Sequence, residues 1–268
     1  MNNSNAVIDK ITNELLSFTK LWEHGYFEGN PLDPLTRSNY GQWGYMSSLH
    51  ATYLRCIKPY VNDSTIVLEI GPGKGAWTKA FLPASEVYVM DAVSAEHTDF
   101  YSYIPKLNKI HYIQILDLNC TELPNNYFNY MFSFGTLCHM SRESIELYAR
   151  NLFEKLKPGA NCFWMISDYK KWNQGVENDN LFLIDRLLRR KLPFRRLLSW
   201  MVKNIFIFSH DNKPIKLVDQ DDLPIPGGWN DNDLERTCQL LVKSGYEVID
   251  PDVGTCLRDP IIHFQKPN

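Results

Sequence analysis

An acidic residue followed by three glycines is the part of this sequence whose spacing best suits chemistry. Residues 65–78 read TIVLEIGPGKGAWT, and the apolar, β-branched start of this run predicts a buried β-strand. Gly71, Gly73 and Gly75 follow at alternate positions. A glycine turn after a buried strand lets bare backbone approach a bound ligand. Glu69, at the strand tip, would repel a pyrophosphate but suits a cationic or amino-bearing ligand.

The glycine pattern alone leaves the ligand open. In the dinucleotide fingerprint G-x-G-x-x-G the third glycine position falls on Ala76, a variant which that fingerprint allows. The run EIGPGKG also resembles the first motif of the class I S-adenosylmethionine (SAM) methyltransferases. That resemblance implies SAM as cofactor and S-adenosylhomocysteine as product. Glu69 would then meet the ligand's amino group, directly or through a water, and the glycine backbone would accommodate its methionine portion. The alternative is a glycine-rich turn in another nucleotide-binding α/β fold.

A second acid ends the next predicted strand, residues 86–91 (EVYVMD). A carboxylate about twenty residues beyond the glycines is where a ribose is commonly held, because it can accept from both hydroxyls. The resemblance therefore implies that Asp91 binds the ribose and that Ala92 lies beside the adenine. A turn-capping role for Asp91 is the alternative.

The following strand ends supply the remaining cofactor candidates. Asp117 comes directly after a predicted strand at 110–116, and the resemblance implies that it accepts from the adenine amino group while the backbone of Leu118 donates to the ring. Phe134 and Gly135 follow another strand, and the family lines the methionine portion there. Turn capping by Asp117 is again the alternative.

Methyl transfer to an alcohol requires a base, and His139 is the candidate. It lies five residues beyond the end of a predicted strand, at the carboxyl edge where open α/β sheets bind ligands. Its imidazole titrates near neutrality when unperturbed. Asp168 and Tyr169 end the fifth strand at the same edge. We expect Asp168 to orient His139 or bind acceptor hydroxyls, and Tyr169 to bind the acceptor; capping or acceptor contacts are the alternatives for His139 and Asp168.

The N-terminal region contains an amphipathic helix at 6–22 and then an aromatic, glycine-rich segment at 22–46. Loops rarely carry so many aromatic residues unless they cover something. We interpret this segment as a lid in which Tyr40 and Gln42 bind the carboxylate end of the cofactor. A hydrophobic arm that packs on the core or on a second subunit, as in a homodimer, is the alternative.

The regular alternation of predicted strands and helices stops between residues 170 and 228. This predicts a helical insert that forms the acceptor pocket with His210 and Trp229. A basic run at 181–204 within it has a helical pattern and contains Arg186, Arg189, Arg190, Lys191, Arg195 and Arg196. Three interpretations remain for this run: a solvated helix face, a site for an anionic or sugar-linked acceptor, and a contact with a membrane surface.

Elsewhere strands and helices alternate, which predicts a doubly wound, mostly parallel sheet of seven strands, the Rossmann-like class I methyltransferase fold. We expect an N-terminal lid (1–58), a SAM-binding core (59–169), the insert after strand five (170–228) and a C-terminal helix and strand hairpin that completes the core (229–268). Predicted helices cover 46–58, 74–82, the region of His97, 143–156 and 230–244, and predicted strands cover 65–70, 86–91, 110–116, 130–134, 162–166, 246–250 and 261–265.

Composition limits the remaining function classes. The 268 residues carry a net charge of −3, which gives no global reason to expect nucleic-acid binding. The six cysteines form no C-x-x-C pair, so we expect no metal site. The N-terminus has no signal-peptide pattern and no apolar run reaches membrane-span length, so we expect a cytoplasmic protein.

Two stretches of the sequence resemble a particular group of methyltransferases. Residues 22–44 and 132–141 look like methyltransferases of bacterial surface-polysaccharide gene sets. The sequence therefore predicts a SAM-dependent O-methyltransferase that acts on a small polar acceptor, with a sugar or sugar derivative first. An N- or carboxyl-directed small-molecule methyltransferase and a non-catalytic partner subunit that keeps the fold are the alternatives.

Overall fold

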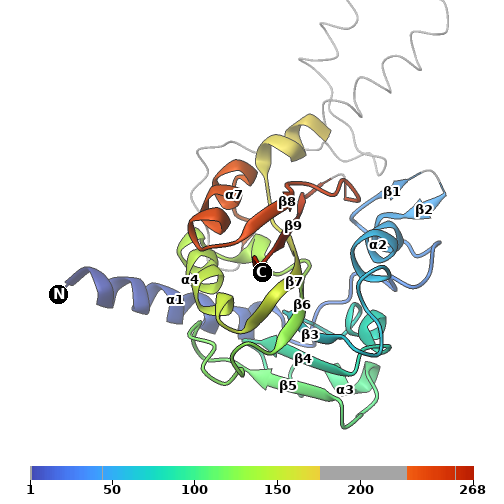
Figure 1. The fold of residues 1–268 in the computed structure, drawn as a ribbon, viewed down its shortest axis with the longest axis horizontal. Coiled ribbons are helices and arrows are strands. Elements are labelled where there is room, and N and C mark those ends of the chain that lie inside the picture. The colour runs from blue at the N-terminus through green and yellow to red at the C-terminus, as the bar shows by residue number, and fades with distance from the viewer. Residues whose placement is uncertain (1, 44, 176–227, 257) are drawn as a thin grey trace, which may run out of the picture.

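The computed structural model, which describes residues 2–43, 45–175, 228–256 and 258–268, contains one sheet of seven strands in the order β5-β4-β3-β6-β7-β9-β8 (Figure 1). Strands β3 to β7 pair in parallel, whereas β9 runs antiparallel to both β7 and β8. This confirms the predicted doubly wound, mostly parallel sheet and its closing antiparallel pair. The strands are β3 (Ile66–Ile70), β4 (Glu86–Asp91), β5 (Ile110–Gln114), β6 (Phe128–Ser133), β7 (Leu156–Met165), β8 (Glu247–Asp250) and β9 (Ile261–Gln265).

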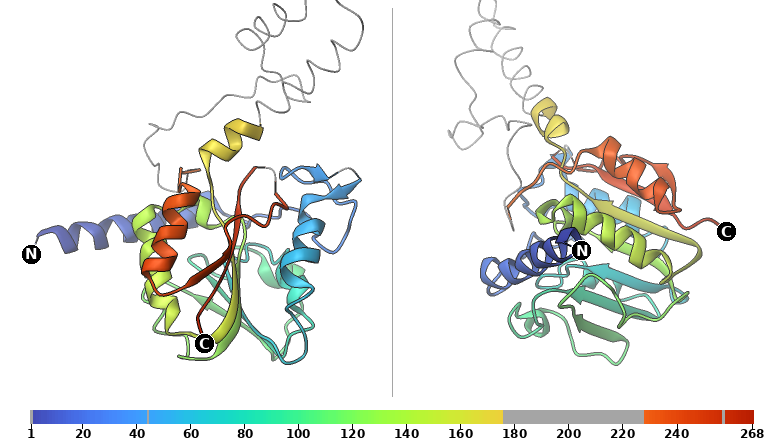
Figure 2. Two further views of the ribbon diagram at one scale, coloured as in Figure 1. Left: turned by 45° about the horizontal axis from the view of Figure 1, so that its top comes forward. Right: turned by 90° about the vertical axis from the view of Figure 1, so that its left-hand side faces the viewer.

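Helices cover both faces of the sheet (Figure 2). One face packs against α1 (Asn2–Leu21), α4 (Arg142–Phe153) and α7 (Leu234–Lys243). The other face packs against α2 (Ser48–Thr52), the π-helical turn η1 (Tyr53–Ile57), the 3₁₀ turn η2 (Thr78–Phe81) and α3 (Phe100–Tyr103). A two-stranded hairpin, β1 (Gln42–Trp43) with β2 (Met46–Ser47), precedes α2, and a second 3₁₀ turn, η3 (Leu137–His139), follows β6.

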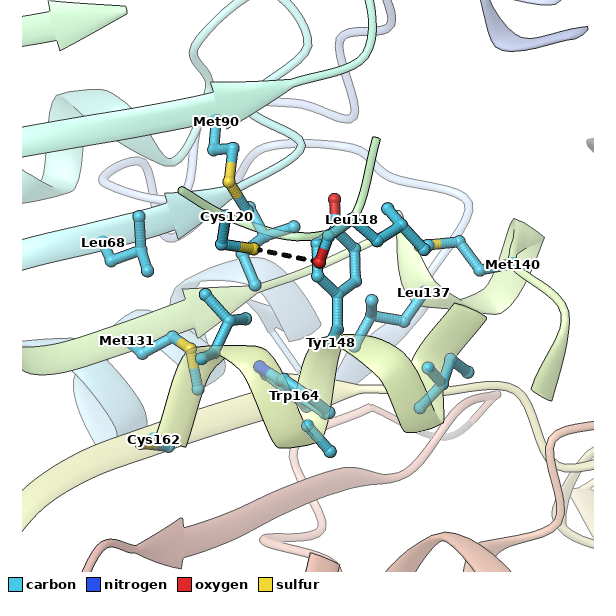
Figure 3. Packing of buried hydrophobic residues seen from close by; sticks show 14 of the residues in the cluster. Leu68, Met90, Leu118, Cys120, Met131, Leu137, Met140, Tyr148, Cys162 and Trp164 are labelled. Carbon is cyan, nitrogen blue, oxygen red and sulfur yellow. Dashed lines mark hydrogen bonds between the residues drawn. The ribbon is translucent and has the colours of Figure 1, made fainter. Parts of the chain in front are cut away.

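Alternation along β3 explains how one strand serves both faces. Leu68 and Ile70 belong to the apolar cluster on the α1, α4 and α7 side, while Val67 belongs to the opposite cluster. Figure 3 shows Leu68 in the first cluster with Tyr148 of α4 and Trp164 of β7. Glu69 shares the face of Val67, so its carboxylate is directed into that layer, where the buried hydroxyl of Thr78 lies.

A buried carboxylate joins α1 to the start of α4. Ser141 is the N-cap of α4, and both its backbone N–H and its hydroxyl donate to Glu14, the hydroxyl at 2.8 Å. The hydroxyl of Ser144 donates to the same carboxylate at 2.5 Å. The C-terminal half of α1 is thereby fixed on the body, while its N-terminal half extends away from it (Figure 1).

Two predicted helices are wrong or shorter than expected. The helix predicted at 74–82 is only the short 3₁₀ turn η2, because Gly73 and Gly75 adopt positive φ and end regular helix geometry. His97 lies in a turn and not in a helix, since α3 begins only at Phe100, after Asp99 in the left-handed region.

Other boundaries also need correction. The predicted helix stop at 157–159 lies inside β7, at a register shift against β6, and α4 has already ended at Phe153. The last helix is capped by Asp233, which accepts from the N–H of Arg236, and not by the predicted Asn230 or Asp231. Most of the predicted insert, with the basic run at 181–204, lies outside the described residues, so the predicted division into domains stays a prediction.

Candidate active site

The carboxyl ends of β3, β4 and β6 meet at one edge of the sheet, where a cavity of about 730 Å³ opens, counting the space that reaches solvent. Strand tips and the glycine turn form its floor, and the end of α1 with the following segment forms its roof. The lining comprises Leu15, Phe18, Trp22, Gly25, Tyr26, Glu28, Ile70, Gly71, Pro72, Gly73, Met90, Asp91, Ala92, Val93, Thr98, Phe134, Gly135, Thr136, His139, Met140 and Tyr148. Small-molecule sites are concave and have a mostly apolar lining of this kind.

The glycine turn needs its glycines for packing as well as for backbone shape. Gly71 and Gly73 have φ of 70° and 52°. A Cβ at Gly71 would lie 2.0 Å from Oγ1 of Thr136, and one at Gly73 would lie 2.7 Å from the carbonyl oxygen of Tyr26. The turn is therefore held between the end of β6 and the N-terminal segment. Gly75, in contrast, packs on α3 and does not line the cavity.

Asp91 lies at the tip of β4 and lines the cavity beside Ala92; its role as ribose ligand stays a prediction. The backbone N–H of Val93 donates to its Oδ1 at 3.0 Å, which fixes the carboxylate. Burial raises the pKa of Asp91 to about 6, against the lowering effect of backbone hydrogen bonds from Val93, Gly73 and Ala92. This carboxylate can still accept from two hydroxyl groups.

Glu69 is placed differently from the predicted cofactor contact. Its side chain is only 2% exposed and does not line the cavity. The hydroxyl of Thr78 donates to Oε2 at 2.6 Å. Burial raises the pKa of Glu69 to about 8. The predicted direct or water-mediated contact with a ligand amino group stays a prediction.

Glu28 is a functional candidate that sequence reasoning missed. It lines the cavity, and the indole N–H of Trp77 donates to its Oε1 at 3.1 Å. Burial raises its pKa to about 7, more than its hydrogen bonds lower it. The segment carries no periodic pattern that could mark one acid; the only available signal was its high aromatic content.

Phe134 and Gly135 line the cavity at the end of β6, and their contact with the methionine portion of the cofactor stays a prediction. Tyr40 is buried against them: its ring lies 4.8 Å from that of Phe134, and a Cβ at Gly135 would lie 3.2 Å from its hydroxyl. Tyr40 itself is not part of the lining, and Gln42 is exposed on the β1–β2 hairpin.

The predicted adenine contacts lie outside the cavity lining. Asp117 is exposed, and its Oδ1 accepts from the N–H of Asn119 at 2.8 Å, an Asx-turn contact. Leu118 is buried in the apolar cluster, where its carbonyl accepts from Asn151 and from the thiol of Cys120 (Figure 3).

His139 ends η3 on the cavity wall, where its ring lies 5.0 Å from that of Trp22. Its Nδ1 is 3.2 Å from the carbonyl oxygen of Gly228. Because a carbonyl only accepts, Nδ1 carries the proton in this contact, and in the neutral ring Nε2 then holds the lone pair. The contact with Gly228 thus favours the tautomer of His139 that carries the proton on Nδ1.

The other acceptor candidates lie beside the cavity but do not line it. Asp168 accepts the backbone N–H groups of Lys171 and Leu234, each at 2.8 Å, which are the contacts of a helix cap. Tyr169 donates through its hydroxyl to the carbonyl of Trp229 at 2.7 Å, and the two rings lie 4.7 Å apart. His210 lies outside the described residues.

Two further properties concern metals and membranes. Among the described residues, no three histidines, cysteines or acids are grouped so that they could hold a metal ion. None of the helices in the described part of the chain is both long and apolar enough to cross a membrane.

Comparison with known proteins agrees with this geometry. Residues 67–159, which contain the glycine turn, Asp91 and His139, match the family model of the methyltransferase domain. The chain is a SAM-dependent methyltransferase. The enzyme assignment and the cofactor predicted from the EIGPGKG run are thereby confirmed.

Solved structures show the same fold for this methyltransferase. It is similar to a protein from Listeria monocytogenes assigned to the SAM-dependent methyltransferases, with 15% identity over 82% of this chain and 100% of that chain, at a TM-score of 0.51. It is also similar to a SAM-dependent methyltransferase from Mesorhizobium loti, with 14% identity over 81% of this chain and 96% of that chain, at a TM-score of 0.50. No curated protein matches the chain.

The cavity fits the charge of such a cofactor. SAM carries a sulfonium, an ammonium group and two ribose hydroxyls. The lining offers the carboxylates of Asp91 and Glu28 on an apolar surface, with no lysine or arginine among the described residues that form it. A site of this composition favours a cation over an anion.

Proposed function

We propose that this methyltransferase transfers a methyl group from SAM to a hydroxyl oxygen of a small polar acceptor, with a sugar or sugar derivative as the first choice. The observation that carries the oxygen assignment is His139 on the wall of the cofactor cavity, with Nδ1 directed at a carbonyl. The sugar class is supported by the resemblance of residues 22–44 and 132–141 to methyltransferases of polysaccharide gene sets.

The chain's own residues divide the work of the reaction. When bound, SAM supplies a methyl group on a positively charged sulfur that an acceptor lone pair can displace. Asp91 would hold the ribose hydroxyls, and the backbone at Gly71 and Gly73 would accommodate the methionine portion. His139 would remove the acceptor proton through Nε2, while the contact with Trp22 fixes the plane of its ring. Positioning of the two reactants supplies much of the remaining acceleration.

The acceptor is proposed to lie on the side of His139 away from Asp91, near Tyr169 and Trp229. These two rings pack together beside the end of β7, where Tyr169 is buried and Trp229 is partly exposed. Sugar rings pack well on aromatic faces through their C–H groups. The cytoplasmic location, an anionic or sugar-linked acceptor and the homodimer stay predictions of the sequence.

A screen with labelled SAM over hydroxyl, amine and carboxylate acceptors tests this function. With the best acceptor, we expect His139→Ala to lower kcat by roughly 10²–10⁴-fold, the range for loss of a general base. S-adenosylhomocysteine affinity should change by less than about threefold, because a base acts on the acceptor. His111→Gln, on edge strand β5 and outside the cavity lining, is the matched control.

Two outcomes would contradict the proposal. Activity of His139→Ala within a few-fold of the parent would indicate a nucleophile that needs no base, as in the N- and carboxyl-directed alternatives. Labelling of amines or carboxylates but of no hydroxyl acceptor would do the same.

A further inference from the structure

Glu28 reaches the cofactor cavity from outside the methyltransferase domain, within the segment between α1 and the β1–β2 hairpin. Its carboxylate lines the cavity and accepts from Trp77, on the turn that follows the glycines. No lysine, arginine or histidine among the described residues forms an ion pair with it. A largely buried carboxylate without a cation is unfavourable by itself, so this position calls for a positively charged ligand group.

The position of Glu28 along the edge indicates which ligand group this is. A Cβ at Gly135 would lie 3.7 Å from Oε1 of Glu28, so the carboxylate stands over the end of β6. Asp91 stands at the end of β4, on the other side of β3. Two strand spacings separate these tips, roughly 10 Å. A ribose held at Asp91 therefore leaves the amino-acid portion of the cofactor to extend toward Glu28.

Glu69 is less able to serve this group. Its carboxylate is 2% exposed, points into the face behind the glycine turn and is closed by the hydroxyl of Thr78. A direct contact with a ligand would require that hydrogen bond and the packing around it to change, whereas Glu28 already faces the space.

We propose that Glu28 binds the α-ammonium group of the cofactor's methionine portion, the role that the family resemblance gives to Glu69. This inference rests on the cofactor occupying the cavity as proposed above, but not on the identity of the acceptor. The N-terminal segment then contributes a charged side chain to the cofactor site, in addition to covering it.

Calorimetric titration with three thioether ligands tests the inference without turnover. S-adenosylhomocysteine has both amine and carboxylate, 5′-(3-aminopropylthio)adenosine has only the amine, and 5′-(3-carboxypropylthio)adenosine has only the carboxylate. We expect Glu28→Gln to weaken the two amine-bearing ligands by about 10–100-fold, the size of a lost charge-assisted contact. The affinity for the carboxypropyl ligand should stay equal or rise. Glutamine can still accept from Trp77, so the fold should be kept.

Two variants serve as comparisons in the same experiment. Glu23→Gln changes an exposed acid of the same segment outside the lining and should leave all three affinities within about twofold. Glu69→Gln should not distinguish amine-bearing ligands from the third. Thermal unfolding of each variant, with and without ligand, separates a folding defect from a binding defect.

The inference would be overturned if Glu28→Gln weakened all three ligands equally, or if the amine-selective loss appeared in Glu69→Gln instead. Unchanged affinities with a lower kcat would overturn it too and would assign Glu28 to the acceptor. Failure of the unmodified protein to bind S-adenosylhomocysteine at all would count against the proposed function as well, and is distinguishable because it needs no variant.

Discussion

Two pairs of buried or partly buried carboxylates in this molecule differ in what surrounds them. The carboxylates of Glu14 and Asp168 accept hydrogen bonds from groups of the protein itself. Glu14 accepts from three N–H or O–H groups of Ser141 and Ser144, and Asp168 accepts from two backbone N–H groups. Glu28 and Asp91 face a cavity, where Glu28 accepts from the indole N–H of Trp77 and Asp91 accepts from the backbone N–H of Val93. Both pairs are at least partly buried, but only Glu28 and Asp91 line the cavity.

The comparison shows that an acid hidden in a fold becomes a site candidate only when its remaining acceptor positions face accessible space. Asp168 was selected from the sequence because it ends a strand at the active edge, and it is used there as a helix cap. Glu28 was not selected, although it has the cavity-facing geometry. The two pairs should respond oppositely to mutation, in stability for Glu14 and Asp168 and in ligand affinity for Glu28 and Asp91.

The largest effect is expected on stability, at Glu14, whose carboxylate accepts from Ser141 and Ser144. Glu14→Ala leaves the Ser141 N–H and two hydroxyl groups without their acceptor at the buried junction of α1 and α4. We expect the free energy of unfolding to fall by about 3–4 kcal/mol, because each group that loses a charged partner pays most of its desolvation. Urea titration followed by circular dichroism measures this.

Lys10→Met is the matched control for that measurement. Lys10 pairs with Glu143 across the same helix contact at 3.0 Å, but both side chains are about half exposed. Its removal should change stability by less than about 0.5 kcal/mol. Equal losses in the two variants would remove the distinction between buried acids that accept from the protein and exposed ones.

An intermediate effect is expected on ligand affinity, at Asp91, which faces the cavity. Asp91→Asn keeps an acceptor for Val93 but loses the charge that would hold two ribose hydroxyls. We expect affinity for S-adenosylhomocysteine to fall by about 10–100-fold. The stability of the ligand-free protein should be equal or higher, because a partly desolvated charge is removed.

Titration calorimetry and urea unfolding of Asp91→Asn are best run beside Asp63→Asn, an exposed acid in the turn before β3. A variant at position 91 that bound normally yet unfolded more easily would place Asp91 with Glu14 and Asp168, and would count against the ribose contact.

The smallest effect is a pH dependence. Burial raises the pKa of Glu28 to about 7 and that of Asp91 to about 6, above their ordinary values near 4. At a pH between the ordinary and the raised pKa values, these two carboxyl groups are protonated in the folded protein but ionised in the unfolded chain. The ligand-free protein should therefore lose stability as pH rises from about 5 to 8, and Glu69, whose pKa is raised to about 8, acts in the same direction.

Cationic SAM favours the ionised carboxylates, so the increase in unfolding temperature that it gives should grow with pH over the same range. Differential scanning fluorimetry at pH 5, 6, 7 and 8, with and without SAM, measures both trends. In Glu28→Gln the dependence should be weaker. A stability of the ligand-free protein that rises with pH would contradict the assignment of these two acids.

The periodic part of the fold was predictable from sequence because its period is local. Strand β4 was predicted with its observed bounds, and β9 likewise, since apolar runs between polar turns define short buried strands. The start of β7 was not, because Pro158 and Gly159 normally end elements and here occupy a register shift that depends on the neighbouring strand. The cap at Asp233 could not be chosen among four adjacent polar residues, 230–233, without the tertiary contacts.

The candidate site divides in the same way. Asp91 and Gly71 have positions that follow from strand ends, so spacing located them. Glu28 lies in an aperiodic segment whose path is decided by packing against Trp77 and the glycine turn, and no sequence spacing relates it to Asp91. The aromatic content of residues 22–46 indicated a covered surface but could not indicate which side chain faces it.

The anchoring of α1 through Glu14 has a consequence for engineering this enzyme. Ser141 lies two residues beyond His139, and Trp22, which contacts that imidazole, directly follows the end of α1. The segment after α1, which covers the cofactor cavity, and the turn that carries His139 are thus both anchored at the contact between Glu14 and Ser141. Attempts to widen acceptor choice by redesigning the roof alone would also move the histidine, so both would have to be varied together in any directed-evolution library.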